Sequence, residues 1–180
     1  MKGFKEWMKK QQLEWRRHPG NVSAKGAGTQ NRRTYAHVLP KASWEENLWP
    51  GLQRGQPLEL AAALRAADIQ AHTGVHNLLS SWVACANLYF PFRSEQCDRE
   101  LVASFLGAAV DPAIKELTGI QLEWAGEGAL QPAHLLGEQG GKRGSAQTSP
   151  DVAFTVRART NGKTIDGVVL VESKLTEGSF

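Results

Sequence analysis

The dipeptide Asn161-Gly162 lies between two apolar runs and constrains the fold more than any other feature of the chain. Asn-Gly in that setting is the strongest short-range signal for a β-hairpin with a two-residue turn. Counting outward from such a turn places Arg157 opposite Asp166, which is a favourable charge pair. The sequence therefore predicts two antiparallel strands whose register is known, provided that neither strand contains a bulge.

The same count places two acids opposite each other at the far end of the hairpin. Asp151 faces Glu172, and Lys174 lies on the same face as Glu172 because strand side chains alternate. Two facing carboxylates repel each other and destabilise a hairpin. A divalent cation between them would offset this repulsion, so the sequence predicts a metal site at this end.

Two carboxylates at one point are a typical oxygen site for Mg²⁺, which keeps waters and binds substrate phosphates. Lys174 could orient a metal-bound water, help its deprotonation or offset phosphate charge. The carbonyl oxygen of Ser173 could add a ligand. In the structural alternative, Asp151 caps a strand edge and Glu172 forms a surface salt bridge with Lys174.

Pro150-Asp151, two strands and then Glu172-Ser173-Lys174 resemble the PD-(D/E)XK nuclease superfamily, with its restriction-endonuclease-like fold. The resemblance covers about residues 95–174. It implies Mg²⁺-dependent cleavage of nucleic acid, usually DNA, with Mn²⁺ as a substitute, and double-stranded DNA is the expected partner of this chain. It makes Asp151 and Glu172 the metal ligands and puts Lys174 near the attacking water.

Many members of this superfamily also carry an acid on the helix before the first strand. Glu100 is the candidate for that role, and Glu116 is the reserve. The chain departs from the family at its end, because a second core helix and a last strand should follow the tripeptide. A fragment of a longer protein, a sheet completed by another chain, or a protein without nuclease activity would each explain this departure.

Four further residues are candidates for contact with nucleic acid. They lie in or next to the glycine-rich stretch before the acids, and they are Lys142, Arg143, Gln147 and Ser149. Basic and hydroxyl or amide side chains commonly position a phosphate backbone. A solvated basic loop with turn-forming residues explains the same sequence equally well.

The expected fold class is α/β (α+β mixed), with a helical N-terminal region at residues 1–93 and a restriction-endonuclease-like mixed sheet at residues 94–180. Apolar spacing and helix signals predict helices over residues 4–17, 58–70, 75–86, 94–110 and 112–118. Residues 20–34 are expected to be a loop and residues 120–124 a strand. The continuous apolar run Val168–Val171 predicts a central strand buried on both faces.

Charge and cysteine content limit the functional classes. The net charge of the chain is only +3, and basic residues gather between Met1 and Arg17. This permits a nucleic-acid partner, although a solvated helix face explains it equally well. Neither a signal peptide nor an apolar run long enough for a membrane span is evident, so we expect a cytoplasmic protein without a membrane partner. Cys85 and Cys97 show no metal or redox spacing.

The sequence therefore predicts a metal-dependent DNA endonuclease, with a restriction role as the working assumption. A homodimer would supply the two sites that cutting both strands requires. One alternative is a non-catalytic nucleic-acid-binding or assembly subunit with an incomplete nuclease fold. Another is an exonuclease or repair nuclease of the same superfamily.

Overall fold

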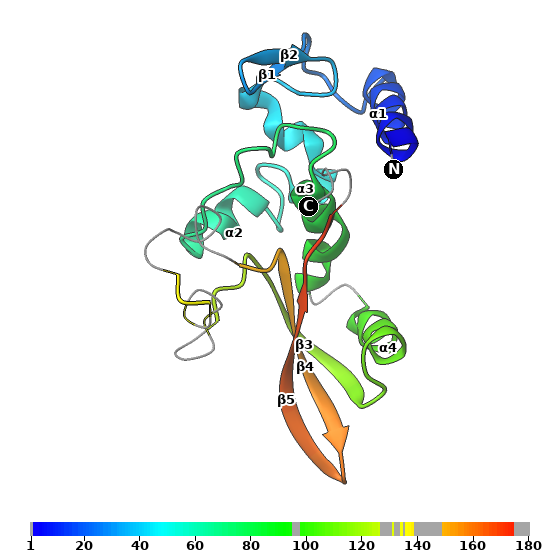
Figure 1. The fold of residues 1–180 in the computed structure, drawn as a ribbon, viewed down its shortest axis with the longest axis vertical. Helices are drawn as coiled ribbons and strands as arrows, with labels where there is room; N and C mark the ends of the chain where they lie inside the picture. The colour runs from blue at the N-terminus through cyan, green and yellow to red at the C-terminus, as the bar shows by residue number, and fades with distance from the viewer. Residues whose placement is uncertain are drawn as a thin grey trace. The chain divides into compact units, whose positions relative to one another are not determined.

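Helices precede the main sheet along the chain, as Figure 1 shows. The computed structural model describes residues 2–94, 98–126, 131, 134, 136–138 and 149–174. One unit of the chain comprises residues 1–87 and 173–180, and the other comprises residues 88–172. The predicted α/β class, with a helical N-terminal part and a C-terminal sheet, is confirmed. In the described part of the chain, no helix is long and apolar enough to cross a membrane.

The first unit is largely helical and contains a small hairpin. Its helical elements are α1 (Lys2–Arg17), the 3-10 helices η1 (Lys41–Asn47) and η2 (Pro50–Leu52), α2 (Leu60–Ala66) and most of α3 (Ser81–Tyr89). Strands β1 (Gly28–Gln30) and β2 (Arg33–Tyr35) pair antiparallel, and all their residues except Tyr35 belong to the stretch 20–34 that the sequence predicted to be a loop. Asn31 and Arg32 form their turn with φ of 51° and 62°. Because these turn residues and their neighbours are polar, the sequence pattern predicted a loop where a short hairpin forms.

Apolar side chains and a few buried amides hold the first unit together. The Asn47 side chain is buried, and its Nδ2 donates to the carbonyl oxygens of Val75 at 3.0 Å and Asn77 at 2.9 Å. Asn87 donates to the Asn47 carbonyl oxygen at 3.0 Å, so these amides satisfy backbone groups that helices and strands leave open. The buried apolar residues are Val38, Leu39, Leu48, Leu52, Leu60, Leu64, Ile69, Val75, Leu78, Leu79, Trp82, Val83, Cys85 and Ala86.

The helix predicted over residues 75–86 begins only at Ser81. The residues before it pair with another segment: the Leu39 amide donates to the His76 carbonyl oxygen at 2.8 Å, and the Leu78 amide donates to that of His37 at 3.0 Å. The apolar spacing of Val75, Leu78 and Leu79 is therefore a burial pattern of an extended segment and a turn. The prediction was wrong for this stretch because spacing alone does not reveal a distant pairing partner.

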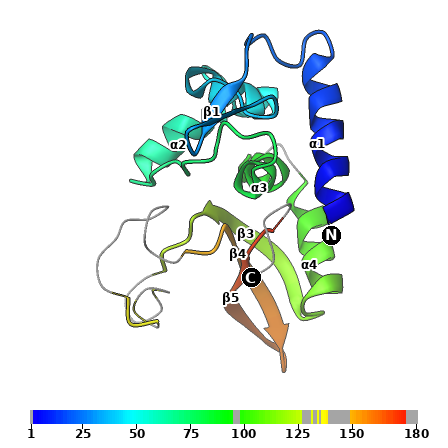
Figure 2. The same cartoon turned by 45° about the horizontal axis from the view of Figure 1, so that its top comes forward.

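The second unit places one helix on a three-stranded antiparallel sheet. Its elements are η3 (Phe90–Arg93), α4 (Arg99–Ala109), β3 (Ile114–Leu122), β4 (Val152–Thr160) and β5 (Lys163–Val171). The strand order is β3-β4-β5, and α4 packs on β3 (Figures 1 and 2). All strand pairs among the described residues are antiparallel. The buried apolar residues are Phe90, Val102, Ala103, Leu106, Ile114, Leu117, Ile120, Leu122, Val152, Ala153, Phe154 and Val156.

Residues 112–118, predicted as a helix, are mostly part of strand β3. Register shifts between Ile114 and Glu116 and between Leu117 and Gly119 each disturb the pairing with β4. A bulge adds a residue to a strand, so the buried positions Ile114, Leu117 and Ile120 recur every third residue. This spacing imitates a helix, and it misled the sequence prediction.

Strand β5 lies at one edge of the sheet, which corrects the prediction of a central strand. Val168 and Leu170 are exposed on one face, whereas Val169 and Val171 on the other face are partly buried. The buried central strand is β4, which includes Val152 and Phe154. A run of apolar residues therefore indicated strand structure correctly but not the place of that strand in the sheet.

Candidate functional site

The β4–β5 hairpin has the register that the sequence predicted. Asn161 and Gly162 form the turn with φ of 50° and 75°, the left-handed values that a two-residue type I′ turn requires. Pairing continues without a bulge from Thr160–Lys163 to Val152–Val171. Arg157 pairs with Asp166, and its Nε lies 3.7 Å from Asp166 Oδ1. The confirmed register sets the positions of the residues that follow at the other end.

Asp151 and Glu172 lie one residue beyond the last β4–β5 pair, each on its own strand. Because side chains alternate, they continue the face that carries Arg157 and Asp166. Asp151 is partly buried and Glu172 is exposed. One acid on each of two neighbouring strand ends, with no intervening bulge, is the geometric basis of the candidate site.

Strand β3 holds the backbone at Asp151 from the other side. Leu122 pairs with Val152, and the pairing continues beyond both strands. The Glu123 amide donates to the Asp151 carbonyl oxygen at 3.0 Å, and the Trp124 amide donates to that of Pro150 at 3.2 Å. The segment that leads into β4 is therefore fixed by the backbone of a neighbouring strand.

Glu123 is a site residue that sequence reasoning missed. Glu123 is only 5% exposed and its φ is 49°. Its Oε2 accepts a hydrogen bond from the Ser149 hydroxyl. The alternation of residues 120–124 indicated an outward-facing side chain, but the positive φ turns the backbone at this point. The available signal was its position directly after a strand, in line with Asp151 on the next strand.

The residues fit a metal site with few protein ligands. Carboxylates of Asp151 and Glu172 are the hard oxygen donors that Mg²⁺ prefers, and Mg²⁺ commonly takes only one or two of them beside water and substrate. Among the residues that the structure describes, no three His, Cys, Asp or Glu side chains are grouped to hold a metal ion. Neither Glu100 nor Glu123 therefore completes a cluster of three with this pair.

The two helix-acid candidates have different surroundings. Glu100 is exposed in the first turn of α4, the helix that precedes β3. Glu116, the reserve, is on β3 instead of a helix, and its carboxylate pairs with Arg157 Nη1 at 3.0 and 3.2 Å. This corrects its helical placement, because the bulged strand includes it.

The remaining predicted site residues lie in three places. Ser173 and Lys174 directly follow Glu172 but are part of the first unit, and Lys174 is exposed. Ser149 precedes Pro150, and its hydroxyl group donates a hydrogen bond to the Glu123 carboxylate. Lys142, Arg143 and Gln147 lie outside the residues that the structure describes.

Comparison with models of protein families gives a match over most of the chain. The family model described as "Restriction Endonuclease associating with ARP" matches residues 9–180. No curated protein and no solved structure matches the chain. The match spans both units, including every residue of the candidate site.

Proposed function

Because the chain belongs to the family of restriction endonucleases associating with ARP, we propose that it is a metal-dependent DNA endonuclease of the PD-(D/E)XK type. The observation that carries the proposal is the unbroken β4–β5 register. It puts Asp151 and Glu172 on adjacent strand ends and on one face, immediately after the last paired residues. Family membership supplies independent support for a role in nucleic-acid cleavage.

In this proposal, the carboxylates of Asp151 and Glu172 and the carbonyl oxygen of Ser173 hold Mg²⁺, or Mn²⁺ in its place. When bound, the metal would polarise a phosphate oxygen and lower the pKa of a bound water. The Lys174 ammonium group would orient the attacking water and offset charge on the phosphate. Glu100 is retained as an optional acid that substrate or metal could recruit.

The residues around Asp151 would keep its carboxylate in position. Two backbone hydrogen bonds from β3 hold residues 150 and 151, and Ser149 is bound to buried Glu123. The hydroxyl proton of Ser149 is used in that bond, so it is not available to a phosphate oxygen. Ser149 therefore suits the role of supporting Asp151 better than direct phosphate contact, which we assign to Lys142, Arg143 and Gln147.

Plasmid cleavage tests the proposal. The chain should cut circular double-stranded DNA with Mg²⁺ or Mn²⁺ and should not cut it with a chelator present. Asp151→Asn, Glu172→Gln and Lys174→Ala should each lower the cleavage rate by at least about 100-fold, because each removes a group that acts on the reacting phosphate.

Asp166→Asn is the matched control for these variants. Asp166 is an acid on the same face of the same hairpin, and among the described residues it pairs with the exposed Arg157. It should retain cleavage, and circular dichroism should show that all four variants fold. Full activity of folded Asp151→Asn or Lys174→Ala would contradict the site assignment.

A second candidate function is a nucleic-acid-binding or assembly subunit that does not cut. The family description names an association with ARP, and an association of this chain with ARP would suit such a subunit. DNA binding without cleavage by the intact gene product, alone or with ARP, would favour this function. Cleavage of linear but not circular DNA would instead favour an exonuclease or repair nuclease.

Two further expectations accompany the nuclease proposal. A homodimer would provide one site for each DNA strand, and light scattering with and without DNA measures this. We place the activity in the cytoplasm, because the two cysteines of the chain, Cys85 and Cys97, show no redox or metal spacing.

A further inference from the structure

The β1–β2 hairpin belongs to a long stretch of sequence without acidic residues. Between Glu14 and Glu45 there is no Asp or Glu, and there are six basic residues, which are Arg16, Arg17, Lys25, Arg32, Arg33 and Lys41. The Glu46 carboxylate contacts this stretch only before β1, where it accepts the backbone amides of Ser23 and Ala24. The stretch itself therefore carries a net positive charge, which favours an anionic partner where its side chains reach solvent.

Two of these basic residues lie at the hairpin tip, which comprises residues 30–33. Gln30 pairs with Arg33, so Asn31 and Arg32 form the apex and Arg33 lies one residue behind it. Asn31, Arg32 and Arg33 are all exposed. The hairpin tip therefore presents one amide and two guanidinium groups to solvent.

The two arginines of the hairpin tip are not used in ion pairs. Neither Arg32 nor Arg33 forms an ion pair with a residue that the structure describes. By contrast, the exposed Arg54, Arg65 and Arg157 each pair with a glutamate. The guanidinium groups at the hairpin tip are therefore available to a partner that offers paired acceptor atoms.

The backbone at Arg32 indicates that this side chain has a role. Arg32 has φ of 62°, a left-handed value that is rare for a bulky residue and costs free energy. The turn between β4 and β5 has Gly162 at the same position, with φ of 75°, and both turns begin with Asn, at 51° and 50°. Glycine at the second position is the choice that stabilises such a turn. An arginine at this strained position therefore points to a function of its guanidinium group.

Contacts behind the hairpin tip hold it in place. The Asn77 side chain donates from Nδ2 to Gln30 Oε1 at 2.9 Å, and buried His76 donates from Nε2 to the Thr29 carbonyl oxygen at 3.2 Å. Gly28, at the base of the hairpin, is buried. A binding element that is ordered before it meets its partner loses less conformational freedom on binding.

We propose that the hairpin tip enters the major groove of double-stranded DNA, where Asn31 and Arg32 contact base edges and Arg33 contacts phosphate. The major groove of B-form DNA is wide enough for a two-stranded β-ribbon. A guanidinium group matches the two acceptors of guanine, and a carboxamide matches adenine. The inference rests on the proposed function for the choice of DNA, and it adds the element that selects the sequence to be cut.

Other anionic partners fit the hairpin tip less well. The major groove of double-stranded RNA is too deep and narrow for side chains to read. Single-stranded nucleic acid is bound by stacking on aromatic rings, and a membrane surface is bound through apolar side chains beside basic ones. Residues 30–34 include neither an aromatic nor an aliphatic side chain. The combination of arginine and asparagine at the apex favours a partner that is read by hydrogen bonds.

Selection from a randomised DNA duplex library, followed by fluorescence anisotropy with a selected duplex, tests the inference. The full chain is used with a chelator present, so that the DNA stays intact. The parent chain should select a preferred sequence and bind the RNA duplex of that sequence at least about 10-fold more weakly. Arg32→Lys keeps the charge but not the planar fork, so it should reduce the preference for selected over random duplex by about 10-fold.

Arg33→Gln should weaken the binding of selected and random duplexes equally, because a phosphate contact does not depend on sequence. It should also reduce the slope of log K against log salt by about 0.9. Arg17→Gln is the matched control, since it removes an exposed arginine of the same acid-free stretch that lies on α1 and not on the hairpin. It should leave the preference for the selected duplex unchanged.

Arg32→Gly separates recognition from folding. It should raise the melting temperature by about 2–4 °C, because glycine adopts left-handed φ values without strain. The same variant should bind the selected duplex about 10-fold more weakly than the parent chain. Unchanged preference in both Arg32 variants, no preference in the parent chain, or equal binding of the RNA duplex would each overturn the inference.

The same variants separate this inference from the nuclease proposal. Asp151→Asn should prevent cleavage while the preference for the selected duplex stays within about twofold. If the parent chain does not cut DNA but Arg32→Lys loses the preference, only the nuclease proposal fails. If the parent chain cuts DNA and Arg32→Lys keeps the preference, only the inference about the hairpin tip fails.

Discussion

A side-chain hydrogen bond between Ser149 and Glu123 helps to fix the segment that leads into β4. Glu123 is a buried acid whose carboxylate accepts the Ser149 hydroxyl, although the two residues are 26 positions apart. Removing one partner of a buried charged group leaves the other with a desolvation cost. The position of the segment before Asp151 therefore depends on Glu123, which has no proposed role in the chemistry.

We expect Ser149→Ala to lower the free energy of unfolding by about 1–3 kcal/mol. Glu123→Gln retains an acceptor and should cost less than Ser149→Ala. Urea unfolding of Ser149→Ala, Glu123→Ala and the double variant gives the coupling energy between the two side chains, because each of these single substitutions removes the hydrogen bond. A coupling energy within error of zero would contradict the importance of this hydrogen bond.

The backbone of Leu39 lies so close to Gly28 that no other residue fits there, unlike at most glycines of the chain. Gly28 is buried in β1, and its amide donates to the Val38 carbonyl oxygen at 2.7 Å. A Cβ atom there would overlap the Leu39 carbonyl group, which is backbone and cannot rotate away. Gly28→Ala should therefore cost about 3 kcal/mol or more, measured by urea unfolding.

Gly3→Ala is the control for this substitution. Gly3 lies in α1, and a Cβ atom would have no neighbour within 4 Å. Alanine favours helix over glycine, so this variant should be neutral or stabilised by up to about 1 kcal/mol. Equal effects at both positions would show that the close approach at Gly28 is absent.

At the scale of elements, local sequence was enough to predict the β4–β5 hairpin and the positions of Asp151 and Glu172. The turn, the charge pair and the alternation all lie within one contiguous segment. The bulges of β3, the edge position of β5 and the burial of Glu123 depend on residues far away in the chain. Those features could not be predicted, because the periodic pattern of one segment does not identify the segment with which it pairs or packs.

The edge position of β5 has a measurable consequence for stability. Leu170 is exposed on β5, whereas Phe154 is buried on β4, where its ring meets Tyr89 edge-on at 5.3 Å. Leu170→Thr should change the free energy of unfolding by less than about 0.5 kcal/mol. Phe154→Ala should cost about 3–5 kcal/mol. If Leu170→Thr lowered the free energy of unfolding by about 3 kcal/mol, β5 would be a buried central strand, as the sequence alone predicted.

For the whole molecule, two titrating groups predict loss of stability in acid in two stages. Burial and the charges of Lys9 and Lys5 hold the pKa of His37 below its ordinary 6.5. The unfolded chain therefore takes up this proton first, so stability falls as pH drops from 6.5 toward the folded pKa. Over that window, folding opposes protonation of His37.

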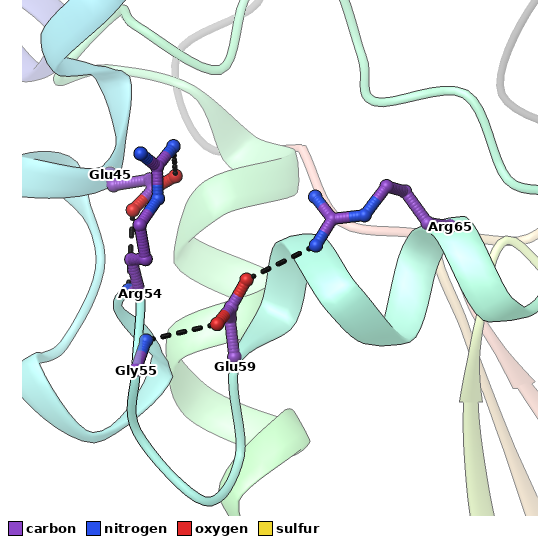
Figure 3. A network of polar contacts seen from close by, with 5 residues as sticks. All are labelled: Glu45, Arg54, Gly55, Glu59 and Arg65. Carbon is purple, nitrogen blue, oxygen red and sulfur yellow. Dashed lines mark hydrogen bonds and ion pairs between the residues drawn. The ribbon is translucent and has the colours of Figure 1, made fainter.

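Glu59 acts in a second, more acidic window. The Gly55 amide donates to its carboxylate at 2.9 Å, and this bond, followed by the interaction with Arg65 at 3.3 Å, lowers its pKa below 4.5 (Figure 3). The stabilisation is complete above pH 4.5 and is lost as pH falls through the folded pKa. The Glu45–Arg54 pair in Figure 3, at 3.0 Å, lies beside the same turn.

Unfolding free energies measured in urea from about pH 8 to pH 3 should therefore decline in two separable stages. His37→Gln should flatten the stage below pH 6.5, and Glu59→Gln should flatten the stage below pH 4.5. His18→Gln is the control, because it removes a histidine that is exposed to solvent. If His37→Gln left the upper stage as steep as in the parent chain, His37 would not be the group that takes up the proton in that stage.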